Sequence, residues 1–356
     1  MKVLIVSRSF YPSIGGIETI SMNLAGEFVK LGHEVSILTD PRPIAEEKRN
    51  RFPFKIVSSK KFFDWVAEFR RMDVAICMNV SAPALFASWI SGTKLLIVHQ
   101  NTLNQRTAYK RVVVPFFSRL LKSRLIHFFP NVACSKFVAS KLPVPAKVIP
   151  NFYDDSVFKS GNRSRSSDFV FCGRLNEAKG VDVALSALGQ VAKTVPDVRM
   201  TIVGDGPERG ALEELAASLS LTNNVKFEGF VSGEALSTLL NDHSCMLVPS
   251  RWEEAFGIVA LEGIACCDLV IARDIGGLPE AVGSCGEIVD GRVESWAKAM
   301  LQVATDRRAG HAIRTQPTEE IRKCHLAKHG RTGVALQYME ALQEVLSGVF
   351  LKSLER

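Results

Sequence analysis

The stretch VPSRWEEAFGIVALEGIACC, residues 248–267, contains the change of hydrophobic period that decides the fold class. The apolar run CMLV, which begins at Cys245 and ends before a Pro-Ser pair, predicts a buried strand. From Ile258 onward the apolar residues recur at helical spacing, and Gly257 is the predicted entry to the helix. A strand that turns directly into a helix is typical of open α/β sheets, which bind ligands beyond the carboxyl ends of their strands.

Two carboxylates, Glu254 and Glu262, lie eight positions apart in this stretch. Glu254 falls in the predicted turn and Glu262 about one helical turn into the helix, so both can face the space above the strand. The spacing alone leaves two interpretations open. The pair either holds a ligand, or it consists of a solvated acidic loop and a glutamate that stabilises the beginning of the helix.

The same alternation of strand and helix recurs on both sides of this stretch. Polar residues 41–73 give a less definite pattern, and the polar segment SGNRSRSSD, residues 160–168, predicts a linker. The sequence therefore predicts an α/β protein with two doubly wound Rossmann-like domains, residues 1–160 and 161–335, and a cleft between them. A last helix, residues 336–356, is expected to cross back to the first domain. The predicted strands lie at residues 3–7, 34–40, 74–78, 94–101, 131–135, 147–151, from 168 to 172 or 173, 224–230 and 245–250. Two more strands are predicted within MTIVGDGPE (200–208) and LVIARDIGGLPEAVG (269–283), each running into a glycine turn.

The composition is that of a soluble globular protein, with 47% hydrophobic and 23% charged residues among 356. The N-terminal MKVLIVSRSF does not resemble a signal peptide, and no apolar run approaches the roughly 18 residues that span a bilayer. The eight cysteines form no CxxC pair and are expected to be free thiols. These features predict a cytoplasmic protein.

The positive charge is concentrated in the first half of the chain. Residues 1–159 carry 23 Lys plus Arg against 11 Asp plus Glu, a net charge of +12, whereas the remainder carries 21 against 26, a net charge of −5. Residues 74–153 contain no acidic side chain, which predicts an anionic partner for this half. Nucleic acid is one such partner, but no recognition motif is present.

Basic and apolar residues alternate in RTAYKRVVVPFFSRLLKSRLIHFF, residues 106–129. Such a composition suits a helix on an anionic membrane surface, and it equally suits a core helix with solvated basic side chains.

Two further features of the first half fall at positions where a site is expected. Gly15 and Gly16 precede a predicted helix, where free N–H groups and the helix dipole suit a phosphate, or where glycine serves only a tight turn. The missing GxGxxG spacing argues against a dinucleotide cofactor. His99 follows the apolar part of a predicted strand, where it is either a satisfied structural residue or part of a site.

Taken together, these motifs resemble the GT-B glycosyltransferases, and specifically the retaining enzymes of family 4. The resemblance covers nearly the whole chain, and the order and spacing of its parts make it specific. It rests on the glycine loop at Gly15 and Gly16, IPNFYDDSVF (149–158), CGRLNEAKG (172–180), VGDGP (203–207), the stretch from Glu254 to Glu262, and IGGLPEAVG (275–283).

The resemblance implies a role for each motif residue. Glu262 would accept hydrogen bonds from the ribose hydroxyls, and Glu254 would contact hydroxyls of the transferred sugar. Arg174 and Lys179 would grip the nucleotide diphosphate and neutralise charge on the leaving group. His99 would position or polarise the reacting groups. The catalytic residues implied are His99, Glu254, Arg174 and Lys179, and the substrate-binding ones are Gly15, Gly16, Arg174, Lys179, Glu254, Phe256, Gly257, Ile258, Val259 and Glu262.

The implied activity is transfer of a hexose or N-acetylhexosamine from a UDP- or GDP-linked sugar, with retention of configuration. The acceptor would be a polysaccharide or lipid-linked saccharide of cell-envelope or lipopolysaccharide synthesis, and no metal or cofactor is implied. The enzyme would be cytoplasmic or peripheral on the cytoplasmic membrane face. Phe152, Cys267 and Asp268 depart from the family pattern. The alternatives are a GT-B sugar-nucleotide epimerase and a basic nucleic-acid-binding protein.

Overall fold

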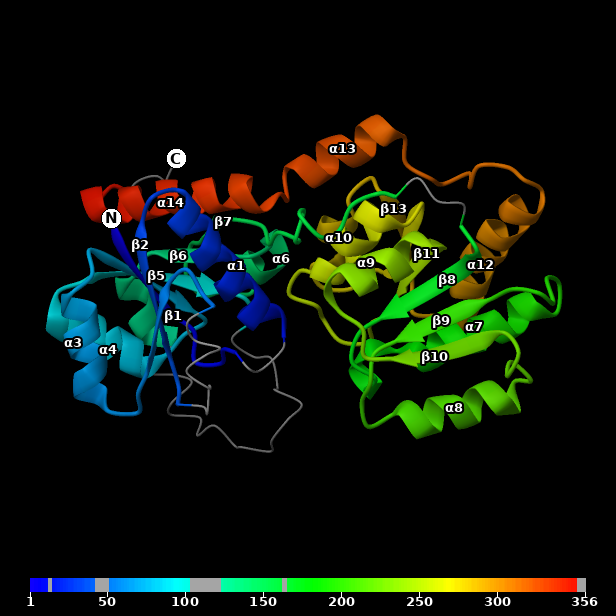
Figure 1. The fold of residues 1–356 in the computed structure, drawn as a ribbon, viewed down its shortest axis with the longest axis horizontal. Helices are drawn as coiled ribbons and strands as arrows, with labels where there is room; N and C mark the ends of the chain where they lie inside the picture. The colour runs from blue at the N-terminus through cyan, green and yellow to red at the C-terminus, as the bar shows by residue number, and fades with distance from the viewer. Residues whose placement is uncertain (12–14, 42–50, 103–122, 162–164, 351–356) are drawn as a thin grey trace. The chain divides into compact units, whose positions relative to one another are not determined.

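The computed structural model describes residues 1–11, 15–41, 51–102, 123–161 and 165–350. It divides the chain into two compact units (Figure 1). Unit 1 consists of residues 1–152 and 331–356, and unit 2 consists of residues 153–330. The chain passes from one unit to the other after Phe152, which is buried, and after Gly330.

Unit 1 contains a seven-stranded parallel sheet in the order β3-β2-β1-β4-β5-β6-β7. Its strands are near-continuous apolar runs, and all five residues of β4 are buried, as expected for a parallel sheet covered on both faces. The elements are β1 (Lys2–Val6), α1 (Gly16–Lys30), β2 (Glu34–Thr39), β3 (Lys55–Ser58), α3 (Phe62–Arg70), β4 (Val74–Met78), α4 (Ala82–Ser91), β5 (Lys94–His99), η1 (Ile126–Phe128), β6 (Asn131–Ala133), α6 (Lys136–Ser140), β7 (Lys147–Val148) and α14 (Arg331–Ser347).

The C-terminal helix α14 packs on α1 and β5 of unit 1 (Figure 1). Lys147 Nζ lies 3.0 Å from a carboxylate oxygen of Glu344, and Thr332 donates to the buried carboxylate of Glu27 on α1. Buried Val334, Tyr338 and other side chains complete the contact on the apolar side of the helix.

Unit 2 contains a six-stranded parallel sheet in the order β10-β9-β8-β11-β12-β13. The two sheets confirm the predicted α/β class with two doubly wound Rossmann-like folds. The elements are β8 (Ser167–Cys172), η2 (Glu177–Lys179), α7 (Val181–Ala192), β9 (Met200–Val203), α8 (Arg209–Ser218), β10 (Val225–Gly229), α9 (Gly233–Asn241), β11 (His243–Val248), α10 (Ile258–Cys266), β12 (Leu269–Arg273), α11 (Leu278–Val282), β13 (Gly286–Val289), α12 (Val293–Arg308) and α13 (Glu319–Ala327).

Helix α10 ends at a buried arginine supplied by α13. The guanidinium of Arg322 donates to the carbonyl oxygens of Ile264, Cys267 and Asp268 at 3.2, 2.6 and 2.8 Å. A cation at this end compensates both the unpaired carbonyl groups and the negative end of the helix dipole. Asp268, one of the positions that depart from the family pattern, forms an ion pair with Arg165 at 3.1 Å.

Candidate functional site

The candidate site of unit 2 lies at the carboxyl ends of the central strands. The strand order reverses direction between β8 and β11, and ligands of open α/β sheets bind at such a switch point. The loop after β8 carries Arg174 and Lys179, and the loop after β11 carries Glu254. The predicted turn into a helix is confirmed, because α10 begins at Ile258 and Gly257 is its N-cap with φ of +104°.

Three loops pack against one another to position Glu254. The Arg251 N–H donates to the Ala178 carbonyl at 2.8 Å, which joins the loop after β11 to the loop after β8. The Gly277 N–H donates to the Glu254 carbonyl at 2.7 Å and adds the loop after β12. At Gly276, where φ is +61°, a Cβ atom would lie 2.4 Å from that same carbonyl oxygen, so only glycine allows this approach.

Lys179 and Glu254 form an ion pair at this edge. Lys179 Nζ lies 2.6 Å from Glu254 Oε1, and the hydroxyl of Ser250 donates to the same oxygen at 2.8 Å. Burial alone would raise the pKa of Glu254, but the charge and hydrogen bond of Lys179, together with Ser250, hold it below its ordinary value. Glu254 is therefore ionised at neutral pH, and its Oε2 has no hydrogen bond to any residue that the structure describes.

Glu262 has the opposite electrostatic environment. Burial and the nearby carboxylate of Asp154 raise the pKa of Glu262 to about 8. Its carboxyl group has no hydrogen bond or ion pair within the described ranges. Burial and Glu262 also raise the pKa of the Cys172 thiol to about 12, against the opposing charge of Lys179. Cys172 ends β8, so Glu262 and Lys179 both lie near the end of this strand.

The other predicted residues of unit 2 surround this cluster. Arg174 is exposed two residues beyond β8. Phe256 is buried, with its ring 5.4 Å from that of His329. Ile258 and Val259 occupy the first turn of α10, where the amide groups lack the i−4 carbonyl partners of the helix interior, and the Ala260 N–H donates to the Gly257 carbonyl at 2.9 Å. The structure thus pairs Lys179 with Glu254 and places Glu262 and Lys179 near Cys172 in unit 2, whereas Gly15, Gly16 and His99 belong to unit 1.

His99 lies at the carboxyl end of β5, and a neutral hydrogen-bond network fixes its ring. Its Nε2 lies 2.8 Å from Asn131 Oδ1, and the Asn131 amide nitrogen donates to the carbonyl groups of Ile126 and Phe129. Asn131 must therefore accept from His99, which assigns the proton to Nε2 and leaves Nδ1 as an acceptor. Burial lowers the pKa of His99, and the hydrogen bond to Asn131 offsets only part of this effect.

Buried polar atoms beside His99 were not anticipated from the sequence. The Asn151 amide donates to Gln100 Oε1 at 2.8 Å, and Asn79, with φ of +64°, accepts from the Gln100 backbone N–H. Among the described residues, Gln100 Nε2 and Ser81 Oγ are buried with no hydrogen-bond partner. Polar groups left unpaired cost free energy unless a ligand pairs them, so this edge suits a hydroxylated ligand.

Gly15 and Gly16 occupy the predicted position at the beginning of α1. Gly15 is the N-cap in an extended conformation, and Gly16 is the first helical residue. The Glu18 side chain lies over this turn, because its Oε2 would be 2.6 Å from a Cβ atom at Gly15. A phosphate at this helix end would therefore meet the Glu18 carboxylate.

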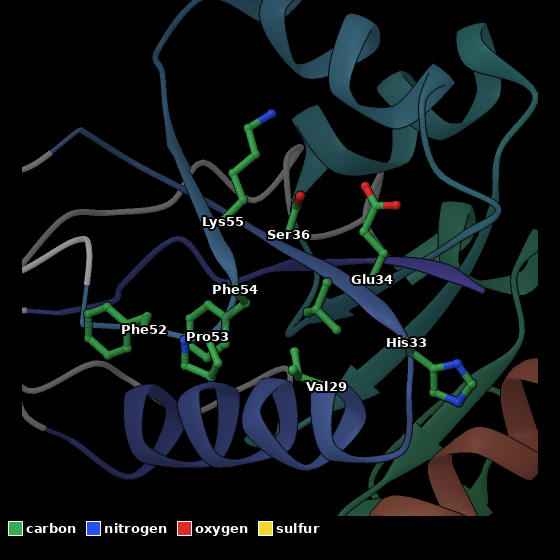
Figure 2. A pocket seen from close by; sticks show the side chains of 9 residues that line it. Val29, His33, Glu34, Ser36, Phe52, Pro53, Phe54 and Lys55 are labelled. Atoms are coloured by element: carbon green, nitrogen blue, oxygen red, sulfur yellow. The ribbon is translucent and has the colours of Figure 1, made fainter.

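A hollow of about 350 Å³ lies elsewhere in unit 1, between α1 and the beginnings of β2 and β3 (Figure 2). Val29, Phe52, Pro53 and Phe54 form its apolar wall. Because it is at the amino ends of these strands, it lies at the edge opposite to the candidate residues. Over the described ranges, no three His, Cys, Asp or Glu side chains are grouped to hold a metal ion. None of the helices in those ranges is long and apolar enough to cross a membrane.

Comparison with known proteins agrees with this geometry. Residues 153–323 match the model of the family glycosyl transferases group 1. A phosphatidylinositol N-acetylglucosaminyltransferase subunit of Arabidopsis thaliana is 26% identical, covering 79% of this chain and 69% of that protein. A GDP-mannose-dependent alpha-(1-6)-phosphatidylinositol monomannoside mannosyltransferase of Mycolicibacterium smegmatis is 27% identical, covering 87% and 91%. The crystal structure of Anabaena HepE in complex with UDP has a TM-score of 0.80 and 19% identity, covering 97% and 100%.

The two doubly wound sheets have the GT-B fold of that crystal structure. The match to the family glycosyl transferases group 1 is confined to residues 153–323, just under half of the chain, which lie within unit 2.

Proposed function

We propose that this glycosyltransferase moves a hexose or N-acetylhexosamine from a nucleotide-diphosphate sugar to a lipid-linked or polysaccharide acceptor. The observation that carries the proposal is the pairing of Lys179 with Glu254 beside an uncharged Glu262 at the switch point of unit 2. Transfer proceeds with retention of configuration and without a metal ion. The matches described above lend no support to an epimerase or a nucleic-acid-binding protein.

Glu254 and its neighbours hold the sugar and diphosphate. Oε1 of Glu254 is engaged by Lys179 and Ser250, which leaves Oε2 to accept a hydroxyl of the transferred sugar. Arg174, the Lys179 ammonium and the first-turn amide groups of α10 supply positive charge and N–H donors for the phosphates. The same groups stabilise the negative charge that develops on the leaving group.

Glu262 holds the ribose. A carboxylate can accept from both hydroxyls of a vicinal diol, whereas a carboxylic acid offers one acceptor fewer and one donor. Because the pKa of Glu262 is raised to about 8, the free enzyme carries its proton at pH 7. Donor binding in the ionised form therefore releases up to one proton.

The acceptor is proposed to be lipid-linked, by analogy with the two relatives whose names include phosphatidylinositol. The basic first half suits such an anionic acceptor. The proposed enzyme is cytoplasmic, and peripheral on the membrane face. Of residues 106–129, the proposed membrane contact, 106–122 lie outside the described residues. In the remainder, Phe128 is exposed and Ile126 is buried.

A thermal-shift screen against UDP- and GDP-linked sugars tests the donor, because a ligand that binds only the folded state raises the melting temperature. One nucleotide sugar is expected to stabilise the protein, and Lys179→Ala and Glu262→Ala should remove the shift while the fold survives. Near-normal turnover in both variants would contradict the proposal.

Incubation of that donor with candidate acceptors then separates the activities. Transfer requires an acceptor, persists in EDTA and gives a product whose NMR coupling constants match the anomeric configuration of the donor. An epimerised donor without acceptor would instead indicate the epimerase. Salt-sensitive DNA binding, with no thermal response to nucleotide sugars, would indicate the nucleic-acid-binding protein.

A further inference from the structure

Helix α4 of unit 1 presents an apolar face to solvent. The ten residues APALFASWIS contain no charged side chain. Ala84, Leu85 and Ala87 face the core, whereas Phe86, Trp89 and Ile90 are 40%, 79% and 50% exposed. The helix is therefore apolar on its buried side and on its outer side.

Helix α3 packs beside α4 (Figure 1) and also exposes an apolar side chain. Its Phe63 is 82% exposed, the largest exposed fraction among the described large hydrophobic residues. We call Phe63, Phe86, Trp89 and Ile90 the α3–α4 patch. Isolated exposed apolar residues are common, but a group on two adjacent helices marks an interaction surface.

We propose that the α3–α4 patch inserts into the surface of a bilayer that contains anionic lipids. A helix of ten residues is about half the length needed to span the hydrocarbon core, so α4 would lie in the interface plane. Trp and Phe are the side chains enriched at this depth. This proposal rests on the proposed function in one respect, because a lipid-linked acceptor resides in the bilayer that the patch would bind.

The chemistry of the patch favours lipid over a protein partner. Protein interfaces combine apolar contacts with about one hydrogen bond per 100–200 Å². Among the four patch side chains, only the indole N–H of Trp89 can form a hydrogen bond. A bilayer requires no such complementarity.

The charges around the patch match anionic headgroups. Lys60 and Lys61 precede α3, and Arg70 and Arg71 are at its end; all four are exposed. Of the acidic groups on the same elements, Glu68 is buried and paired with Lys55 and Arg71, whereas Asp64 and Asp73 are exposed and accept hydrogen bonds from Ser59 and from the Lys2 N–H. Beyond Asp73 no acidic residue occurs until Asp154. Each lysine or arginine near an anionic leaflet adds to the attraction, and an apolar insertion supplies the second anchor.

The test is flotation of the full-length protein with phosphatidylcholine vesicles, with and without phosphatidylglycerol. The wild type is expected to bind the anionic vesicles, and the double variant Phe86→Ala/Trp89→Ala should bind about tenfold less tightly or worse. Phe230→Ala is the matched control, because Phe230 is a 61% exposed aromatic residue of unit 2 and should not affect binding. The donor-induced thermal shift, retained in the double variant, shows that it is folded.

Tryptophan fluorescence tests directly whether Trp89 contacts the bilayer. Of the four tryptophans, Trp65 and Trp296 are buried, whereas Trp89 and Trp252 are exposed. In Trp252→Phe protein, a blue shift on adding anionic vesicles therefore reports Trp89. No vesicle binding, binding without this shift, or an oligomer that dissociates in the double variant would each overturn the proposal.

The proposal and the proposed function fail separately. Transfer to a detergent-solubilised lipid acceptor by a protein that binds no vesicles would refute only the α3–α4 patch. Vesicle binding through Trp89 without transfer to any lipid acceptor would refute only the proposed acceptor.

Discussion

Replacement of Glu262 by glutamine is expected to stabilise the donor-free protein while abolishing donor binding. Burial and Asp154 raise the pKa of this carboxyl group from 4.5 to about 8. Between these two pH values the folded protein retains a proton that the unfolded chain has released. The free energy of unfolding therefore falls as pH rises from 4.5 to 8, and this group adds no further dependence on pH below or above that window.

The size of the effect follows from the width of the window. Each pH unit between the two pKa values lowers the free energy of unfolding by about 1.4 kcal/mol. From pH 4.5 to pH 7 the total loss is about 3 kcal/mol. Glutamine has the same shape without the charge. Glu262→Gln should therefore equal the wild type near pH 4.5 and exceed its stability by up to about 3 kcal/mol at pH 7.

The assay is urea denaturation without ligand at pH values from 4.5 to 9. Glu214→Gln is the control, because it removes an exposed carboxylate from α8 of the same unit and should leave the pH dependence unchanged. Calorimetry of donor binding at pH 7 in buffers of different ionisation enthalpy should show proton release by the wild type. If the curves of Glu262→Gln and wild type stay parallel from pH 4.5 to 8, the carboxyl group is solvated in the free protein and the reasoning is wrong.

Three further variants test how the cluster is held. Lys179→Ala should raise the pKa of Glu254, because burial then acts without the compensating ammonium. The same variant should reduce the transfer rate at least about a hundredfold, and a near-normal rate would contradict the role of Lys179 in donor binding. Arg322→Met should lower the free energy of unfolding by about 2–4 kcal/mol, measured by denaturation, since three carbonyl groups lose their donor. Gly276→Ala should reduce turnover because the added methyl group displaces the loop that carries Glu254. Gly210→Ala is the control, because Gly210 has open space around it in α8 and its replacement should be neutral or slightly stabilising. Equal turnover in both variants would refute the role of Gly276 in positioning this loop.

The sequence predicts the sheets because their strands are covered on both faces. β4 is a continuous apolar run, and β11 is apolar from Cys245 to its end, so neither pattern depends on alternation with polar residues. Residues 41–73 have a less definite pattern, although β3 and α3 occupy part of this range. β3 is at the edge of the sheet and only partly buried, so its residues alternate weakly, and α3 keeps Phe63 on its outer side.

The candidate site is only partly visible in the sequence. The position of Glu254 in the turn follows from the local pattern around it. Its electrostatics do not, because Ser250, Lys179 and the Gly276 loop reach it from the ends of three different strands. The same applies to Asp154, which is more than a hundred residues from Glu262 and changes its protonation. The IPNFYDDSVF motif contained the signal, but no rule of spacing links it to α10.

The carboxyl ends of the strands differ in charge between the two sheets, so each sheet edge suits ligand groups of a different chemistry. In unit 2, the cation of Lys179 and the amide groups of α10 suit the phosphates of a donor. In unit 1, His99 is neutral, Gln100 and Ser81 offer unpaired donors, and Glu18 lies over the helix end that would otherwise suit a phosphate. Neutral amide, hydroxyl and imidazole groups discriminate hydroxyls well, because an analogue without the hydroxyl leaves them buried and unpaired. Diphosphate chemistry is therefore favoured at the edge of unit 2, and an uncharged hydroxylated group at the edge around His99.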